Sequence, residues 1–107
     1  MSPLTARVLI SDCINILSIS VGKPKLGPTR DLNVYLQGPM PGIRPMKVGQ
    51  YKAVGSCDCY GLVRCSDAEL VPIARCTTLS ECQAVALSDY LQWSGLELAP
   101  QEATQEV

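Results

Sequence analysis

The sequence contains no histidine and no phenylalanine. Without histidine the chain lacks the commonest general base and the commonest protein metal ligand, and it cannot build a serine or cysteine triad of the usual kind. The sequence also lacks a glycine-rich phosphate loop, a dinucleotide-binding motif, a nucleophile elbow and an EF-hand loop. These absences exclude most familiar enzyme classes, and we therefore expect a protein that is not an enzyme.

Aromatic side chains and long apolar runs are also scarce. Aromatic residues make up 5% of the chain, so the core must be built mainly from Leu, Ile, Val, Ala and Cys. The longest apolar stretch, residues 8–21, is interrupted by Asp12 and Asn15 and is shorter than the roughly 20 residues that span a bilayer. The same two polar residues make it a poor secretory signal. We therefore expect a cytoplasmic protein without a membrane span.

The composition that remains is that of one small folded domain. Of the 107 residues, 47% are hydrophobic and 18% are charged, which is too apolar for a disordered chain. Residues 1–98 are expected to form this domain. Residues 99–107 are polar and acidic and are expected to form a mobile tail.

Charge is distributed unevenly along the chain, although the net charge is only -1. Residues 22–64 contain seven cations and two anions, whereas residues 76–107 contain five anions and no Lys or Arg. The basic stretch is suited to nucleic acid or another anionic surface. Because its cations are thinly spread, mutual neutralisation within the fold is the simpler interpretation.

Residues 3–21 fit the period of an amphipathic helix better than that of a strand. At 100° per residue their apolar side chains fall in one sector, and strict alternation fails at residues 8–10. Ser2 is a suitable N-cap and Gly22 a suitable stop. The many β-branched residues in this segment make a buried strand pair the alternative.

The rest of the chain predicts a small sheet followed by helices. Three segments favour strands, namely residues 32–37, 48–54 and 60–64. Ser66 and Glu69 have the spacing of a capping box for a short helix that Pro72 ends, and Thr78 and Glu81 have the same spacing before a helix at 79–94. The expected fold class is therefore α+β, with an N-terminal helix, a small antiparallel sheet and a C-terminal helix packed on one face.

Six cysteines are the most distinctive residues of the chain. Buried, reduced thiols that act as small hydrophobic side chains are the favoured interpretation, with Cys13 and Cys82 on apolar helix faces. A disulfide framework is one alternative, and a thiolate zinc site is another. The candidate zinc ligands are Cys57, Cys59, Cys65 and Cys76.

The function favoured by these features is that of a small interaction or regulatory protein, which uses no cofactor and binds another protein or a second copy of itself. The candidate contact residues lie on one apolar face of the helix at 79–94: Leu87, Tyr90, Leu91 and Trp93. Aromatic residues often dominate the energy of such contacts.

The alternative function is that of a zinc module that binds RNA or single-stranded DNA through the basic region. Cations would contact phosphates and tyrosine would stack on bases. The candidate residues for this role are Lys47, Tyr51, Lys52 and Arg64.

Overall fold

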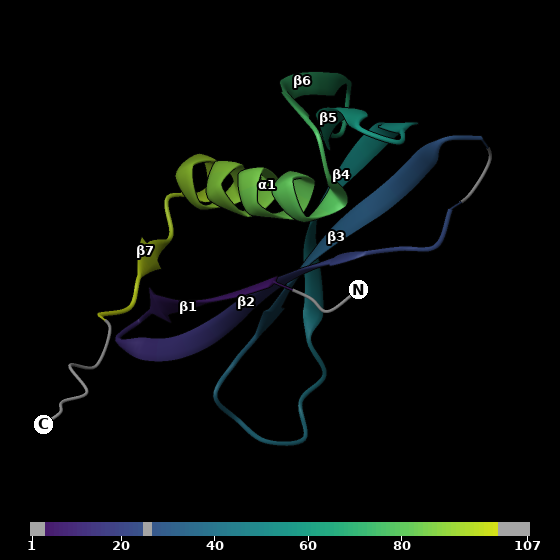
Figure 1. The fold of residues 1–107 in the computed structure, drawn as a ribbon. Coiled ribbons are helices and arrows are strands. Elements are labelled where there is room, and N and C mark those ends of the chain that lie inside the picture. Colours follow the sequence, from purple (N-terminus) through teal and green to yellow (C-terminus); the bar gives the residue numbers. More distant parts are fainter. Residues whose placement is uncertain (1–3, 25–26, 101–107) are drawn as a thin grey trace, which may run out of the picture.

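The computed structural model describes residues 4–24 and 27–100. Seven strands form one curled antiparallel sheet in the order β6-β5-β4-β3-β2-β1-β7, and a single helix follows β6 (Figure 1). The elements are β1 (Leu4–Ile10), β2 (Cys13–Val21), β3 (Thr29–Gln37), β4 (Met46–Ser56), β5 (Cys59–Cys65), β6 (Leu70–Cys76), α1 (Leu79–Ser94) and β7 (Glu97–Leu98).

Helix α1 covers one face of the sheet and closes the core. Tyr51, Leu17 and Ile19 are fully buried between the two layers, together with Cys82 and Ala86 of the helix. Gln83 is also buried, and its amide Nε2 donates a 3.0 Å hydrogen bond to the carbonyl oxygen of Ile19. The helix is therefore attached to the sheet by both apolar packing and a buried polar contact.

The expected N-terminal helix is wrong, because residues 4–21 form the β1–β2 hairpin. Ile10 pairs with Cys13 across a two-residue turn in which Ser11 and Asp12 have φ of 52° and 66°. Two consecutive positive φ angles characterise the type I′ turn, whose twist matches that of paired strands. The proposed N-cap of that helix, Ser2, lies outside the described residues.

This hairpin has apolar residues on both faces, so its sequence does not show the alternation of apolar and polar residues that is typical of a strand. Leu17 and Ile19 point into the core, while Ile14 and Ile16 on the opposite face are 39% and 37% exposed. Apolar residues on both faces remove the polar half of a period-two pattern, and the sequence then resembles a helical stripe. The β-branched residues favoured the correct structure.

The α+β class is therefore replaced by a mostly antiparallel β fold with one C-terminal helix. The short helix expected after Ser66 is also wrong: Ser66 donates from its N–H and its hydroxyl to the carbonyl oxygen of Glu69, at 3.0 and 2.9 Å, and strand β6 follows. Pro72 is tolerated in β6 because this strand lies at the edge of the sheet and its pairing with β5 is irregular beside the Val63↔Pro72 pair.

The helix at 79–94 is confirmed with the expected bounds. The Thr78 hydroxyl accepts a 3.0 Å hydrogen bond from the N–H of Glu81, and Gly95 adopts the left-handed conformation with φ 75° and donates to the carbonyl oxygen of Leu91. Both ends are thus set by local capping chemistry.

The three central strand predictions lie within β3, β4 and β5. At the C-terminal end of the described chain, the N–H of Ala99 donates to the carbonyl oxygen of Arg7 at 2.8 Å. Residues 101–107, the greater part of the predicted tail, lie outside the described range. No helix in the described part of the chain is both long and apolar enough to cross a membrane.

Candidate functional site

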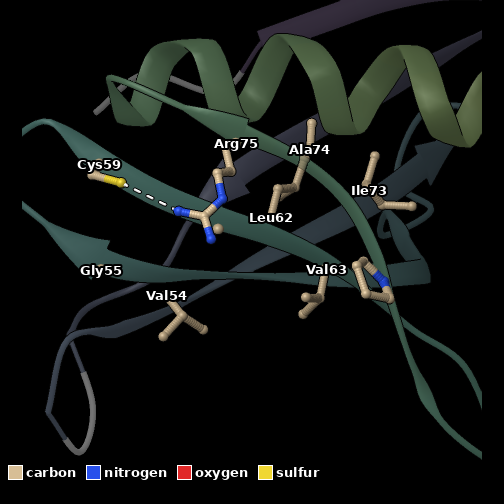
Figure 2. A pocket seen from close by; sticks show the side chains of 10 residues that line it. Val54, Gly55, Cys59, Leu62, Val63, Ile73, Ala74 and Arg75 are labelled. Atoms are coloured by element: carbon tan, nitrogen blue, oxygen red, sulfur yellow. Dashed lines mark hydrogen bonds between the residues drawn. The ribbon is translucent and has the colours of Figure 1, made fainter.

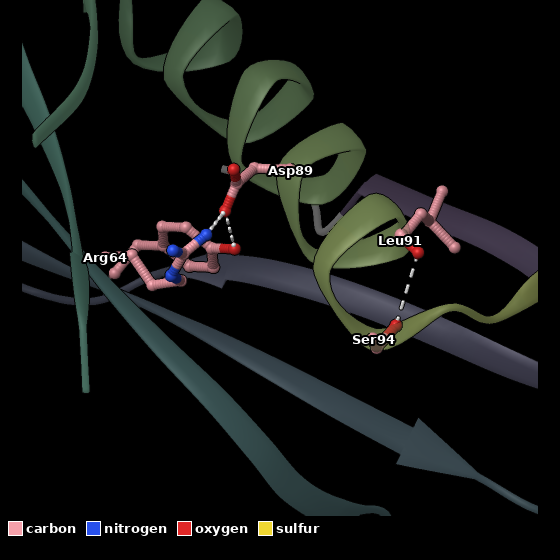
Figure 3. Close-up of polar contacts among 5 residues, drawn as sticks. Arg64, Asp89, Leu91 and Ser94 are labelled. Atoms are coloured by element: carbon pink, nitrogen blue, oxygen red, sulfur yellow. Dashed lines mark hydrogen bonds and ion pairs between the residues drawn. The ribbon is translucent and has the colours of Figure 1, made fainter. Parts of the chain in front are cut away.

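A cluster of three polar side chains joins the sheet to the helix. Asp89 on α1 accepts at one carboxylate oxygen from the Tyr51 hydroxyl at 2.6 Å and from the Arg64 guanidinium at 2.7 Å. Figure 3 shows Arg64 reaching Asp89 from the sheet. Burial and, next, the hydrogen bond to Asp89 raise the pKa of Tyr51 above its usual value, and the hydrogen bond to Asp89 raises the pKa of Arg64. The tyrosine is therefore a protonated donor, and Arg64 is held as a cation.

Trp93 lies one helical turn beyond Asp89 and is 62% exposed. The Arg64 guanidinium carbon is 5.6 Å from the centre of the Trp93 ring system, within the range of a cation–π contact. The ring of Tyr90 is 6.2 Å away at an interplanar angle of 43°. Trp93 is thus an exposed aromatic side chain that contacts two residues with restricted positions: Arg64, which is paired with Asp89, and Tyr90, which is buried.

A groove of about 360 Å³ lies beside these rings, and we name it the Trp93 groove. Its lining comes from the first half of β4, the end of β5, the turn after β5 and the last turns of α1. The lining side chains outside the polar cluster include Lys47, Gln50, Cys65, Ser66, Asp67, Tyr90 and Trp93.

Gly49 permits the close approach of the helix at this point. A Cβ atom at Gly49 would lie 2.9 Å from Cε1 of Tyr90, which is closer than real Cβ contacts allow. The missing side chain lets the Tyr90 ring lie directly on β4, where burial raises the pKa of its hydroxyl. Neither Gly49 nor Asp89 was predicted from the sequence as a site residue. Asp89 lies four residues before Trp93, a spacing that places both on one side of a helix.

The structure separates the predicted protein-contact residues. Leu87 and Tyr90 are 6% and 9% exposed and belong to the core, and Leu91 is partly buried against it. The apolar stripe of α1 therefore faces the chain's own sheet. Trp93 is the most exposed of the four predicted contact residues.

The predicted nucleic-acid residues lie on β4 and β5 and do not form one exposed surface. Tyr51 is fully buried and cannot stack on a base, and Arg64 is engaged by Asp89. Lys52 is half-buried on the opposite face of β4, since its neighbours Tyr51 and Ala53 both point into the core. Lys47 is exposed and lines the Trp93 groove. The groove is thus lined by members of both predicted sets: Lys47, Tyr51 and Arg64 from one, and Tyr90 and Trp93 from the other.

The four candidate zinc ligands do not come together. Cys59 and Cys65 lie at opposite ends of β5, which puts their backbones about 20 Å apart. Cys57 is exposed in the β4–β5 turn, whereas Cys76 is buried. Among the described residues no group of three or more Cys, Asp or Glu side chains could hold a metal ion. All six cysteines are free thiols, and Cys13, expected on a buried helix face, is exposed in the first hairpin.

Cys76 and Cys82 are both buried where β6 leads into α1. Burial and, next, the nearby Cys76 raise the pKa of the Cys82 thiol to about 12. A thiol that stays protonated at neutral pH is a poor nucleophile, so Cys82 acts as a small core side chain.

A second, shallower depression of about 670 Å³ lies on the sheet face that α1 does not cover (Figure 2). Val54 and Val63 point to this face, while Leu62 and Ala74 point towards the helix. Its polar contact is weak: the Arg75 guanidinium lies 3.9 Å from the Cys59 sulfur. The Trp93 groove, with its fixed aromatic and charged side chains, is the better candidate site.

Comparison with known proteins adds no relative: no family model, no curated protein and no solved structure matches this chain. Only the geometry and chemistry of the Trp93 groove therefore indicate a function.

Proposed function

We propose that this chain is a small, non-enzymatic interaction or regulatory protein that binds another protein at the Trp93 groove. The observation that carries the proposal is the exposure of Trp93 while Arg64 and Tyr90 hold its ring. Tryptophan is enriched among the residues that dominate binding energy. A side chain that is already held loses less conformational entropy when a partner covers it.

The polar cluster supports binding rather than catalysis. Tyr51 and Arg64 each donate a hydrogen bond to Asp89, and burial of Tyr51 keeps its hydroxyl protonated. A general base needs a pKa close to the working pH. The cluster is therefore suited to holding α1 and Trp93 in place.

The test is a selection from a phage-displayed library of random dodecapeptides on the purified wild-type protein. Selected peptides are titrated against wild type, Trp93→Ala and the matched control Leu70→Ala, which alters a residue of similar exposure (58%) on β6. We expect Leu70→Ala to bind as wild type does and Trp93→Ala to bind at least about tenfold more weakly. Trp93 is the only tryptophan, so its fluorescence reports on the groove directly.

Two results contradict this proposal. One is selected peptides that bind Trp93→Ala as tightly as wild type, or no selected peptides at all. The other is a Trp93→Ala variant that loses its folded circular dichroism spectrum, which assigns Trp93 to the core.

A second candidate function, binding of RNA or single-stranded DNA, is favoured by one observation: the exposed cation Lys47 lies in the same groove as Trp93. Bases stack on aromatic side chains, and lysine neutralises phosphates. Titration with oligouridylate and oligothymidylate, followed by Trp93 fluorescence at low and high salt, tests it. Salt-dependent quenching that weakens in Lys47→Ala supports it, and unchanged fluorescence counts against it.

A further inference from the structure

Strand β4 is longer than its partner β5, which leaves part of one edge open. The β4–β5 register begins at Tyr51↔Arg64, whereas the β3–β4 register continues to Leu36↔Met46. Residues 46–50 therefore have a neighbouring strand on the β3 side, and no described strand pairs with their other side. This open edge is about 16 Å long at the usual rise per residue.

The chain turns away from this edge after β5. Ser66 donates from its N–H to the carbonyl oxygen of Glu69, and this turn leads into β6. The space that a longer β5 would fill is therefore left beside β4. Residues from both sides of that space, Gln50 on β4 and Ser66 and Asp67 in the turn, line the Trp93 groove.

Residues 46–50 contain no proline, and no described strand covers their open side, although their pairing with β3 shifts register between Gly49 and Lys47. The outer edges of the sheet are less open. Edge strand β6 contains Pro72 and a register shift at Leu62/Val63 in its pairing with β5. On the other side of the sheet, the two-residue edge strand β7 covers β1 at Val8 and Leu9. Proline, irregular pairing and covering segments all discourage added strands.

Side chains next to the open edge suit an extended peptide. Trp93 offers an exposed apolar surface, and Lys47 is an exposed cation whose ammonium group donates a 3.1 Å hydrogen bond to Gln50 on the same strand. When a peptide adds to a sheet edge, its backbone hydrogen bonds supply affinity, and pockets for alternate side chains supply specificity. A groove of about 360 Å³ has room for such side chains.

We propose that the Trp93 groove binds an extended peptide segment of a partner protein, which adds as a strand to β4 along residues 46–50. The segment places an apolar or aromatic side chain against Trp93 and a carboxylate near Lys47. This inference depends on the proposed function, because it specifies how the same groove recognises its partner.

The test uses the tightest dodecapeptide from the phage selection, synthesised with a single N-methyl group moved along its backbone. N-methylation removes one N–H donor at a time, and the N–H groups of a strand point alternately to its two sides. We expect every second N-methyl group within the bound segment to weaken binding by about tenfold and the others to have little effect. Replacing the peptide's acidic residue, or introducing Lys47→Glu, should weaken binding, while the control Lys23→Glu, at an exposed lysine that does not line the groove, should not.

The outcomes separate the two proposals. A peptide that needs Trp93 but tolerates N-methylation at every position overturns strand addition and leaves the proposed function standing. A peptide insensitive to Trp93→Ala overturns both. Dimers in sedimentation of the peptide-free protein that dissociate with Lys47→Glu show that a second copy of this chain occupies the edge, and so overturn the assignment to a partner's peptide.

Discussion

Asp89 receives hydrogen bonds from Tyr51, which is fully buried, and from Arg64, whose side chain is 20% exposed. The partners lie 38 and 25 residues away in sequence, so these contacts fasten the helix to two strands. When an acceptor is removed, a buried donor is left without a hydrogen-bond partner. The loss of folding free energy is then larger than the net contribution of the hydrogen bond itself. The stability of the groove's framework is therefore concentrated in one carboxylate.

At this scale we predict that Asp89→Ala lowers the free energy of unfolding by about 1–3 kcal/mol, because the buried Tyr51 hydroxyl loses its acceptor. The higher helix propensity of alanine offsets only a part of this loss. Urea denaturation measures the change, with the exposed neighbour Ser88→Ala as the control. Equal stability of the two variants would show that the cluster contributes nothing to folding.

In the β1–β2 hairpin, the residue types at the turn are poorly suited to the backbone conformation that they adopt. Ser11 and Asp12 adopt positive φ, although neither is the glycine that such turns usually use. We predict that the double substitution Ser11→Asn and Asp12→Gly raises the free energy of unfolding by about 0.5–1 kcal/mol, because glycine adopts this conformation without strain.

This prediction distinguishes the hairpin from the helix that the apolar period suggested. In the middle of a helix, glycine would lower the free energy of unfolding by about 1 kcal/mol instead. The sign measured by urea denaturation therefore decides between the two structures of residues 4–21. A destabilised double variant would contradict the hairpin.

For the whole molecule, the critical contact is the one between the sheet and the helix at Gly49. We predict that Gly49→Ala lowers the free energy of unfolding by about 1–3 kcal/mol, since the new methyl group must displace the Tyr90 ring. The change should also shift Trp93 fluorescence, because Tyr90 packs near that ring.

Gly61→Ala is the matched control, since a Cβ there meets nothing closer than 3.8 Å. Its effect on the free energy of unfolding should stay within about 0.5 kcal/mol. If the two alanine variants are equally stable, the close approach of helix and sheet at Gly49 is not required.

Single residues of the candidate site were predictable from the sequence, but their arrangement in one groove was not. Trp93 and Tyr90 were expected as contacts on a helix, and Lys47 and Arg64 were assigned to a different, basic surface. Their meeting depends on the β4–β5 register, which sets Tyr51 beside Arg64, and on how α1 crosses that pair. Pairings between residues far apart in sequence leave no local pattern, so the groove and the open edge of β4 could not be foreseen.

By itself the sequence determined α1, because capping at Thr78 and Gly95 and the apolar stripe between them are local features. The three central strand segments were also predicted from the local sequence, and residues 32–37 show alternation of apolar and polar side chains. Tertiary structure alone decided that residues 4–21 pair as strands, because their apolar residues serve two faces and their turn lacks glycine. It alone decided that most of the apolar face of α1 is buried while Trp93 stays exposed, because burial is set by the sheet that packs against the helix.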